Sequence, residues 1–562
     1  MRNVILIALA VFIAVAGGGY CISWYAQAAQ IRRSIEQVIN KANEQQKYIT
    51  YDAIETTGFP RDIYVSVVRP HFAGRVDTLL KTLSAQAHTS QPDATASLPE
   101  WTEDAKLDGT ITIGVNALSD HYSLRVSGNW QRTSVIGGQT IAVVTQSAGD
   151  SLCTLDMAHS GGILGSLWDY HALLRDNARD FFHDVRALDC NGTANAVSDA
   201  ASHAPLVTMG PWRFYVSSAP QGGAEAARVY LKISDVEVTP QGDAMMMLQH
   251  SAFSPNSAPV QYSLFGKQNV EMDLSYVGPA DWQAAGKNPP LDIRLSTFNI
   301  TNQLYNSTMN FFLSNGMSGA DRVARVTFKA ESNVSEQYNA MLQTMLHNFI
   351  QQIYAGKGPP VPLLQPYMQK YSADELYAIA VPAIPDFHSL GKLAQTLDLS
   401  YQGNAELTAG DWALSALELS ASPYGITGSG NAKLAAGHPF PAGQMALSCS
   451  NCPQLIDDVI GYAARLQKAM SYFEPPEKIA AETPMDARLA EGVKGFLRAL
   501  AEPAKEGDNS FSYTIVSDGA MGITVSGKSI NDVLAMYKEY IGSVLQASQP
   551  ASQPAVAPAP GR

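Results

Sequence analysis

The chain has 562 residues, of which 46% are hydrophobic and only 16% are charged, and its formal net charge at pH 7 is −13. A chain of this length exceeds what one hydrophobic core normally organises, so two or more domains are expected. A surface that binds nucleic acid needs clustered lysine and arginine side chains to neutralise phosphates, and the acidic composition argues against that class of protein.

The segment Val4–Tyr25 contains no charged residue and predicts a membrane-spanning helix. At about 1.5 Å rise per residue it would extend roughly 33 Å, enough for the hydrocarbon core of a bilayer. Trp24 stands at its far end, where aromatic rings favour the membrane interface. We therefore predict an uncleaved anchor over residues 1–25. Two alternatives stay open, because Ala26–Ala28 matches a signal-peptide cleavage pattern and Cys21 would be the acceptor of a lipoprotein.

Cysteine usage indicates on which side of the membrane the body of the protein lies. Four cysteines follow the predicted anchor, namely Cys153, Cys190, Cys449 and Cys452, and an even count suits an oxidising compartment. The simplest pairing joins Cys153 to Cys190 and Cys449 to Cys452 as structural disulfides, although four cysteines allow three connectivities. Arginines flank the apolar segment on both sides and decide little. We expect a single-pass protein of the bacterial inner membrane with its bulk in the periplasm.

The C-x-x-C sequence at Cys449–Cys452 has two alternative interpretations. It stands between a strand-like run, Gln444–Ser448, and a helix-like run that starts at Pro453. A helix N-terminus lowers the pKa of a nearby thiol, which is the setting of a redox-active pair. We favour a structural disulfide because no βαβ unit surrounds the motif. A zinc site is disfavoured since two further ligands would be needed, and we expect no metal and no cofactor.

The first half of the body predicts a helix followed by strands. Residues 26–47 predict a helix that continues from the membrane as a stalk. The sequence Gly58-Phe59-Pro60 then separates two alternating runs, and a glycine followed by a proline favours a hairpin turn. Many further alternating runs, punctuated by glycines, predict a β-meander and hence a first β-rich domain over residues 48–334.

The second half predicts more helix. Ser335–Tyr354 carries apolar residues at three- and four-residue spacing, which opens a helical segment over residues 335–393. Strands and helices over residues 394–546 predict a second β-rich and helical domain, and the Ala, Ser, Gln and Pro composition of residues 547–562 predicts a disordered tail. The expected fold class is α+β, with an N-terminal transmembrane helix and two β-rich halves of long antiparallel twisted sheet with packed helices.

One motif suggests nucleotide binding. Gly522–Ser529 matches the phosphate-loop pattern G-x-x-x-x-G-K-S. Its variable residues are mostly β-branched and favour a strand, so we interpret the segment as a strand, a glycine turn and Ser529 capping the last helix. Because no catalytic constellation stands out elsewhere, we do not expect an enzyme.

Two stretches carry a resemblance to a known family. Tyr51–Pro60 reads Y-x-A-I-x-x-x-G-F-P and is followed by V-S-V-V-R-P at Val65–Pro70, while Gly425–Ile460 combines a glycine-rich hairpin, a turn, a strand and a helix. This layout resembles a family of membrane-anchored periplasmic proteins of Gram-negative bacteria that has no assigned activity, and more loosely the AsmA and YdgA-type envelope proteins. The resemblance implies a β-rich body that faces the periplasm and transfers no catalytic residue.

These observations lead to two functional hypotheses. The first is a non-enzymatic, membrane-anchored periplasmic protein that binds or guides lipid or another hydrophobic molecule. The second is a scaffold that holds partner proteins of the envelope at the inner membrane. The partners expected are thus the membrane through residues 1–25, a lipid ligand and envelope proteins, with no nucleic acid.

Overall fold

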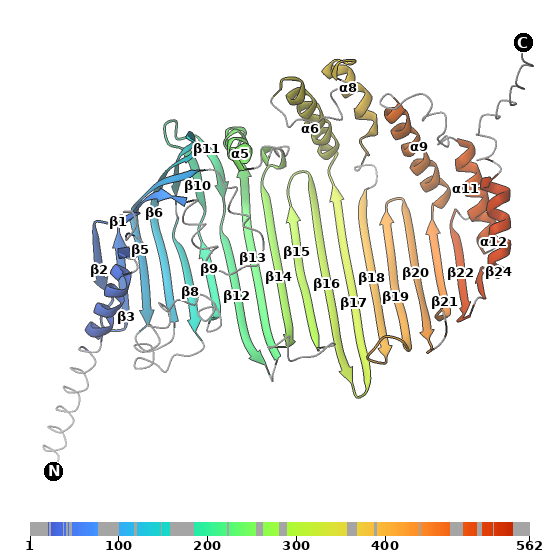
Figure 1. Ribbon diagram of the computed structural model, residues 1–562, viewed down its shortest axis with the longest axis horizontal. Helices are drawn as coiled ribbons and strands as arrows, with labels where there is room; N and C mark the ends of the chain where they lie inside the picture. Colours follow the sequence, from blue (N-terminus) through green and yellow to red (C-terminus); the bar gives the residue numbers. More distant parts are fainter. Residues whose placement is uncertain are drawn as a thin grey trace, which may run out of the picture. The chain divides into compact units, whose positions relative to one another are not determined.

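The protein is mostly β, with few helices, in the computed structural model (Figure 1). The structure describes residues 21, 24–37, 39–40, 43, 48–76, 100–116, 121–147, 149–157, 185–221, 224–253, 262–279, 289–356, 368–386, 391–436, 438, 440–471, 487–502, 509–520, 522–542 and 544. The chain divides into two compact units, Met1–Ser275 and Tyr276–Arg562. The division falls inside the range predicted for the first β-rich domain, 48–334.

Unit 1 is an antiparallel array in the strand pairs described. Its strands are β1 (Ile49–Thr50), β2 (Ala53–Thr57), β3 (Asp62–Val68), β4 (His71–Arg75), β5 (Trp101–Asn116), β6 (His121–Ile136), β7 (Gln139–Ser147), β8 (Ser151–Met157), β9 (Val185–Gly192), β10 (Asn195–Asp199), β11 (Pro205–Met209), β12 (Trp212–Gln221) and β13 (Ala224–Val238). After them come α5 (Pro240–Phe253), the short 3₁₀ turn η1 (Tyr262–Phe265) and β14 (Gln268–Pro279), in which the division between the units falls.

The main core of unit 1 lies between a helix over residues 24–37 and the first strands. Trp24, Ala28, Ile31 and Ile35 recur at three- and four-residue spacing, so they form one buried face of that helix. This face packs on alternate residues of β2, β3 and β5, of which Ile63 is fully buried. The helix expected as a stalk is therefore a core element of unit 1.

The Gly58-Phe59-Pro60 motif forms the turn between β2 and β3, which pair antiparallel from Thr57↔Tyr64 to Ala53↔Val68. Gly58 has a φ of 101°, and a Cβ there would lie 2.6 Å from the carbonyl oxygen of Asp62. Only glycine fits both conditions. The turn also contacts the helix over residues 24–37. Trp24 Nε1 donates to the Asp62 carbonyl oxygen at 3.0 Å, and the Trp24 ring packs edge-on against Phe59.

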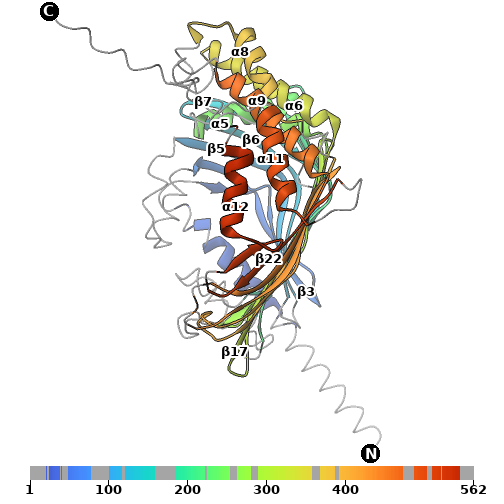
Figure 2. The ribbon, with the colours of Figure 1, turned by 90° about the vertical axis from the view of Figure 1, so that its right-hand side faces the viewer.

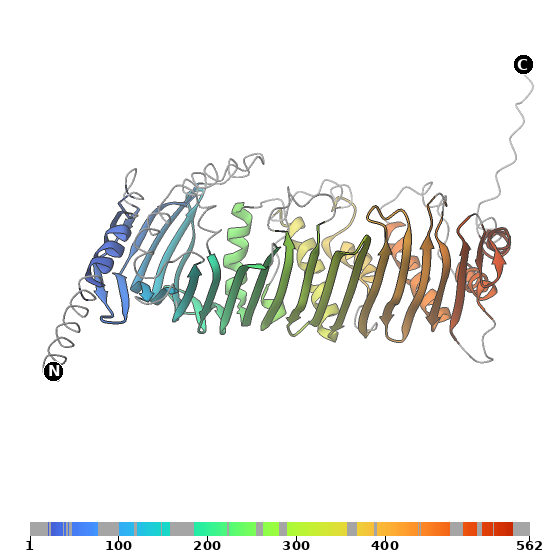
Figure 3. The same ribbon diagram turned by 90° about the horizontal axis from the view of Figure 1, so that it is seen from below.

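Unit 2 contains longer strands and most of the helices. Its strands are β15 (Leu291–Thr301), β16 (Tyr305–Ser318), β17 (Asp321–Val334), β18 (Lys392–Gly403), β19 (Gly410–Ala421), β20 (Tyr424–Leu434), β21 (Ala442–Ser450), β22 (Phe511–Asp518), β23 (Ile523–Val525) and β24 (Lys528–Ser529). Its helices are α6 (Glu336–Tyr354), α8 (Ala373–Ala380), α9 (Cys452–Ser471), α11 (Ala487–Leu500) and α12 (Ile530–Tyr537), with the short turns η2 (Val381–Ala383) and η3 (Lys538–Gly542). Figure 3 shows β15 to β22 side by side in chain order.

Two helices of unit 2, α6 and α12, begin where the sequence predicts. Ser335 precedes α6, whose buried residues are Met341, Ile350 and Ile353. The phosphate-loop look-alike is the short hairpin of β23 and β24, and Ser529 caps α12 by accepting from the Asp532 backbone N–H. The interpretation as strand, turn and cap is confirmed.

The fold-class prediction is wrong in two respects. The protein is mostly β and not α+β, because long strands take up far more of the chain than the helices that pack on them. The N-terminal transmembrane helix is also unsupported: within the part of the chain that the structure describes, no helix has the length and apolar character needed to cross a bilayer. Most of Val4–Tyr25, and the tail 547–562, lie outside the described residues.

Replacing Ile63 by Ala tests the core of unit 1. Ile63 is fully buried under the helix, so we expect the variant to lose about 2–5 kcal/mol of unfolding free energy, measured by urea denaturation. The matched control is Glu55→Ala on the exposed side of β2, expected to change stability by about 0.5 kcal/mol or less. Equal losses for the two variants would contradict this core.

Candidate functional site

The sheet of unit 2 has two chemically different faces. Side chains alternate between faces along each strand, and directly paired residues share a face. From β15 to β22 the pairing places apolar residues opposite apolar residues. They therefore form rows across eight strands. Adjacent strands lie about 4.8 Å apart, so such a row is roughly 34 Å long.

Two neighbouring rows on one face are almost wholly apolar. The first apolar row consists of Leu295, Phe311, Phe328, Leu397, Leu417, Gly428, Leu447 and Tyr513. The second apolar row consists of Ile293, Leu313, Val326, Leu399, Leu414, Gly430, Met445 and Ile515. Every member of both rows is half-buried and none is fully buried. In unit 1, by contrast, Ile63 and Val65 are completely buried beneath their helix.

The opposite face of the same sheet is polar. The guanidinium of Arg325 on β17 forms a two-pronged ion pair with Asp398 on β18, with N–O distances of 3.0 and 2.7 Å. This contact raises the pKa of Arg325, chiefly through the hydrogen bond to Asp398. Glu331 bridges Lys329 and Lys392, and the hydrogen bond from Lys392 is the main cause of its lowered pKa. These ionic side chains suit a face that contacts water.

Two helices, α9 and α11, cover one end of the apolar face. Figures 1 and 2 show α9 and α11 beside one end of the strands, on the inner side of the bend in the sheet. They pack on Cys449, Phe511 and Ile426. Tyr513, which donates to the Leu497 carbonyl oxygen, is the member of the apolar rows found in this cluster, and burial raises its pKa to about 12.

At the other end of the apolar face, β18 and β19 carry two aromatic side chains. Tyr401 on β18 pairs with Trp412 on β19, and their ring centroids lie 4.7 Å apart. The Tyr401 hydroxyl donates into the β18–β19 turn, with the carbonyl oxygens of Ala409 and Asn404 at 2.9 and 3.0 Å. Tyr401 is thereby buried. The apolar rows thus have helices at one end of β20 to β22 and an aromatic pair at the other end of β18 and β19.

Cys449 and Cys452 connect the sheet to its helical cover. Their sulfur atoms lie 2.18 Å apart, and they join the end of β21 to the start of α9. Both are buried, at 6% and 5% exposure, which hides the sulfurs from a thiol partner. The ammonium of Lys494 on α11 lies 2.6 Å from a carboxylate oxygen of Asp457 on α9, so the two covering helices are also joined to each other. The geometry supports the structural interpretation over the redox one.

The other predicted site residues lie in unit 1. Cys153 and Cys190 face each other across β8 and β9 with their sulfurs 2.18 Å apart, so both predicted cysteine pairs are at bonding distance. They lie in a row that includes Leu124 and Phe214. The Gly58–Pro60 turn joins β2 and β3, as described above. The structure does not bring these residues into one site.

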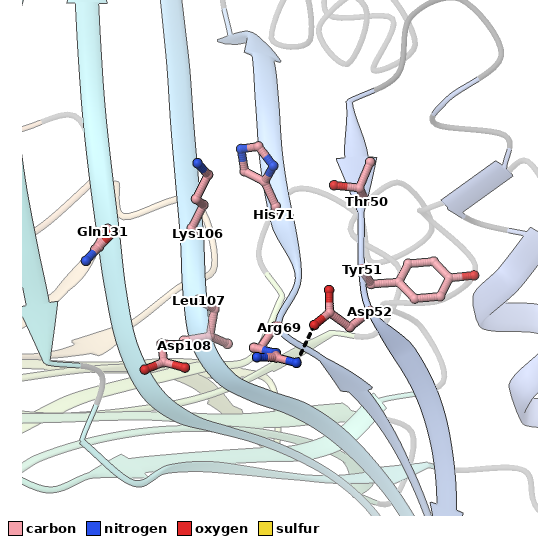
Figure 4. A pocket seen from close by; sticks show the side chains of 9 residues that line it. All are labelled: Thr50, Tyr51, Asp52, Arg69, His71, Lys106, Leu107, Asp108 and Gln131. Atoms are coloured by element: carbon pink, nitrogen blue, oxygen red, sulfur yellow. Dashed lines mark ion pairs between the residues drawn. The ribbon is translucent and has the colours of Figure 1, made fainter.

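A pocket in unit 1 was not found from the sequence. It has a volume of about 560 Å³ and lies over β1, β4, β5 and β6 (Figure 4). Thr50, His71, Lys106 and Gln131 are paired across these four strands and form a single row of polar side chains. The only sequence signal was the alternation of Asp104, Lys106 and Asp108, which by itself is typical of any exposed strand.

No described cluster of side chains is suited to metal binding, since nowhere in the described ranges do three His, Cys, Asp or Glu residues gather. Comparison of the chain with protein-family models, with curated proteins and with solved structures finds no match. The family resemblance drawn from Tyr51–Pro60 and Gly425–Ile460 therefore stays a prediction.

The two disulfides differ in the chain length they close, and this predicts unequal effects on stability. By chain entropy, replacing Cys153 and Cys190 with Ser should cost about 4 kcal/mol, and replacing Cys449 and Cys452 about 2 kcal/mol. Urea unfolding of the two double variants measures both values. A larger loss for the Cys449/Cys452 variant would show that the C-x-x-C contributes more than chain restriction.

Proposed function

We propose that the protein is a non-enzymatic protein of an extracytoplasmic compartment that binds the acyl chain of a lipid along the two apolar rows of unit 2. The observation that carries the proposal is that both rows run across eight strands and stay half-buried throughout. Contiguous apolar surface in contact with water is unfavourable by about 25 cal/mol per Å², and large patches of this kind mark interaction surfaces.

The shape of the rows favours an elongated ligand. The rows lie two residues apart on seven of the eight strands, which is roughly 7 Å, and three residues apart at the irregularity in β19. Each row is roughly 34 Å long. A flexible hydrocarbon chain lying across the strands would contact both rows at once. The rows contain no charged side chain, so recognition would come from the chain and not from a headgroup.

The compartment is proposed from the cysteines. The four cysteines that follow residue 21 form two pairs at bonding distance, one in each unit. Disulfides of this kind persist in oxidising compartments such as the periplasm. The family resemblance supports the same location. The scaffold hypothesis relied on the tail 547–562, which is outside the described residues, so no contact seen in the structure carries it.

Two double variants test acyl-chain binding. Val326→Asn with Leu397→Asn places amides in the middle of the second and first rows, on neighbouring strands. Thr327→Asn with Thr396→Asn places the same amides one residue away, on the polar face. With cis-parinaric acid as the fluorescent probe, we expect at least a tenfold weaker affinity for the first variant and an unchanged affinity for the second.

Urea unfolding of both variants separates binding from folding. The proposal holds if the Val326→Asn, Leu397→Asn variant unfolds in the same cooperative transition as the control and no longer binds the probe. It fails if the unaltered protein does not bind the probe, or if the two variants bind it equally well.

A further inference from the structure

The polar pocket of unit 1 combines hydrogen-bond donors with one cation and one anion that form no ion pair with the residues that the structure describes. Thr50, His71, Lys106 and Gln131 present a hydroxyl, an imidazole, an ammonium and an amide in one row. Neighbouring members are about 4.8 Å apart, so a group placed above the row can accept from two or three of them. Figure 4 shows these side chains on adjacent strands.

One ion pair and one hydrogen-bonding contact frame the row. The guanidinium of Arg69 lies 2.6 Å from a carboxylate oxygen of Asp52, and His71 Nε2 lies 2.9 Å from a carboxylate oxygen of Asp104. Arg69 is exposed at the pocket, so its remaining N–H groups are free to donate to a ligand.

The backbone at Arg69 is held in an unusual conformation. Its φ is 46°, in the left-handed region that non-glycine residues rarely adopt, and the next residue is Pro70. The Arg69 backbone N–H donates to the Gly109 carbonyl oxygen at 2.8 Å, and the Leu107 N–H donates to the Pro70 carbonyl oxygen at 3.0 Å. Neighbouring β5 therefore maintains the strained turn that delivers Arg69 to the pocket. Strain of this kind is concentrated at ligand sites.

Lys106 and Asp108 do not take part in these contacts. Both are exposed and line the pocket, and neither forms an ion pair with any residue that the structure describes. They stand two residues apart on β5, on the same face, which separates them by roughly 7 Å along the strand. A ligand complementary to them carries a negative group and a positive group a few bonds apart.

We propose that this pocket binds a small zwitterion consisting of a phosphate and a primary ammonium. The phosphate accepts from Lys106 and Gln131, which lie on neighbouring strands, since a tetrahedral anion with several oxygens can use two convergent donors. The ammonium donates N–H hydrogen bonds to the Asp108 carboxylate, whereas a fully methylated cation has no N–H group to donate. This inference is independent of the acyl-chain proposal for unit 2.

Calorimetric titration of the full chain with four small probes tests the assignment. The probes are phosphoethanolamine, phosphocholine, inorganic phosphate and ethanolamine. We expect phosphoethanolamine to bind at least tenfold more tightly than each of the others. It alone combines a phosphate for Lys106 with an ammonium whose N–H groups can donate to Asp108. Equal affinities for phosphoethanolamine and inorganic phosphate would overturn the zwitterion assignment, as would an absence of binding.

Two charge-removing variants locate the site. Lys106→Gln should weaken the binding of phosphoethanolamine and of phosphate by at least tenfold each. Asp108→Asn should lower the affinity for phosphoethanolamine to that for phosphate. It should leave the affinity for phosphate unchanged or slightly higher. The controls are Lys433→Gln and Asp411→Asn, an exposed cross-strand pair in unit 2 that should change neither. Loss of binding in the controls, or its retention in both pocket variants, would contradict the site.

The same chemistry occurs free and in lipid headgroups, and flotation with vesicles distinguishes the sources. Vesicles of phosphatidylcholine with and without phosphatidylethanolamine are compared, using the unaltered protein and Asp108→Asn. Capture that requires phosphatidylethanolamine and Asp108 assigns the headgroup. Binding of free phosphoethanolamine alone assigns the soluble zwitterion. The proposal is refuted if neither form binds in a way that depends on Asp108.

Discussion

The in-phase pairing of eight antiparallel strands in unit 2 is the constraint on which the candidate site depends. A slip of one residue between any two strands would move all the side chains beyond it to the opposite face. The pairing contains irregularities between Leu295 and Phe298, between Asp398 and Leu399 and between Leu414 and Leu417, yet the apolar side chains return to the same face after each. Bulges of this kind bend a sheet without giving up its polar and apolar sides.

The two units use their sheets differently. In unit 1 a helix lies on β2, β3 and β5, and the residues beneath it are completely buried. In unit 2 the helices α9 and α11 cover only the ends of β20 to β22, where the disulfide of Cys449 and Cys452 attaches them. The members of the two apolar rows outside this cluster are half-buried, whereas Ile63 and Val65 of unit 1 are completely buried. The uncovered face, and not a catalytic cluster, is the distinctive feature of this unit.

Local features of the fold were predictable from the sequence, while the candidate sites were not. The turn at Gly58, the helix after Ser335 and the Ser529 cap each depend on residues a few positions apart, and periodicity or turn chemistry reveals them. The sequence predicts a stalk helix over residues 26–47, because an apolar stripe does not show what it packs against. The apolar rows depend on register between strands far apart in the chain. The unit 1 pocket likewise joins Thr50 to Gln131 through three strand pairings.

Photocrosslinking with a long-chain fatty acid that carries a diazirine on its hydrocarbon chain tests the central claim most directly. After illumination and proteolysis, mass spectrometry identifies the residues that carry the label. The account predicts labels on members of the two apolar rows, such as Phe328 and Leu397, and none on their strand neighbours of the polar face, Thr327 and Asp398. Labels distributed equally over both faces, or confined to the polar face, would contradict it.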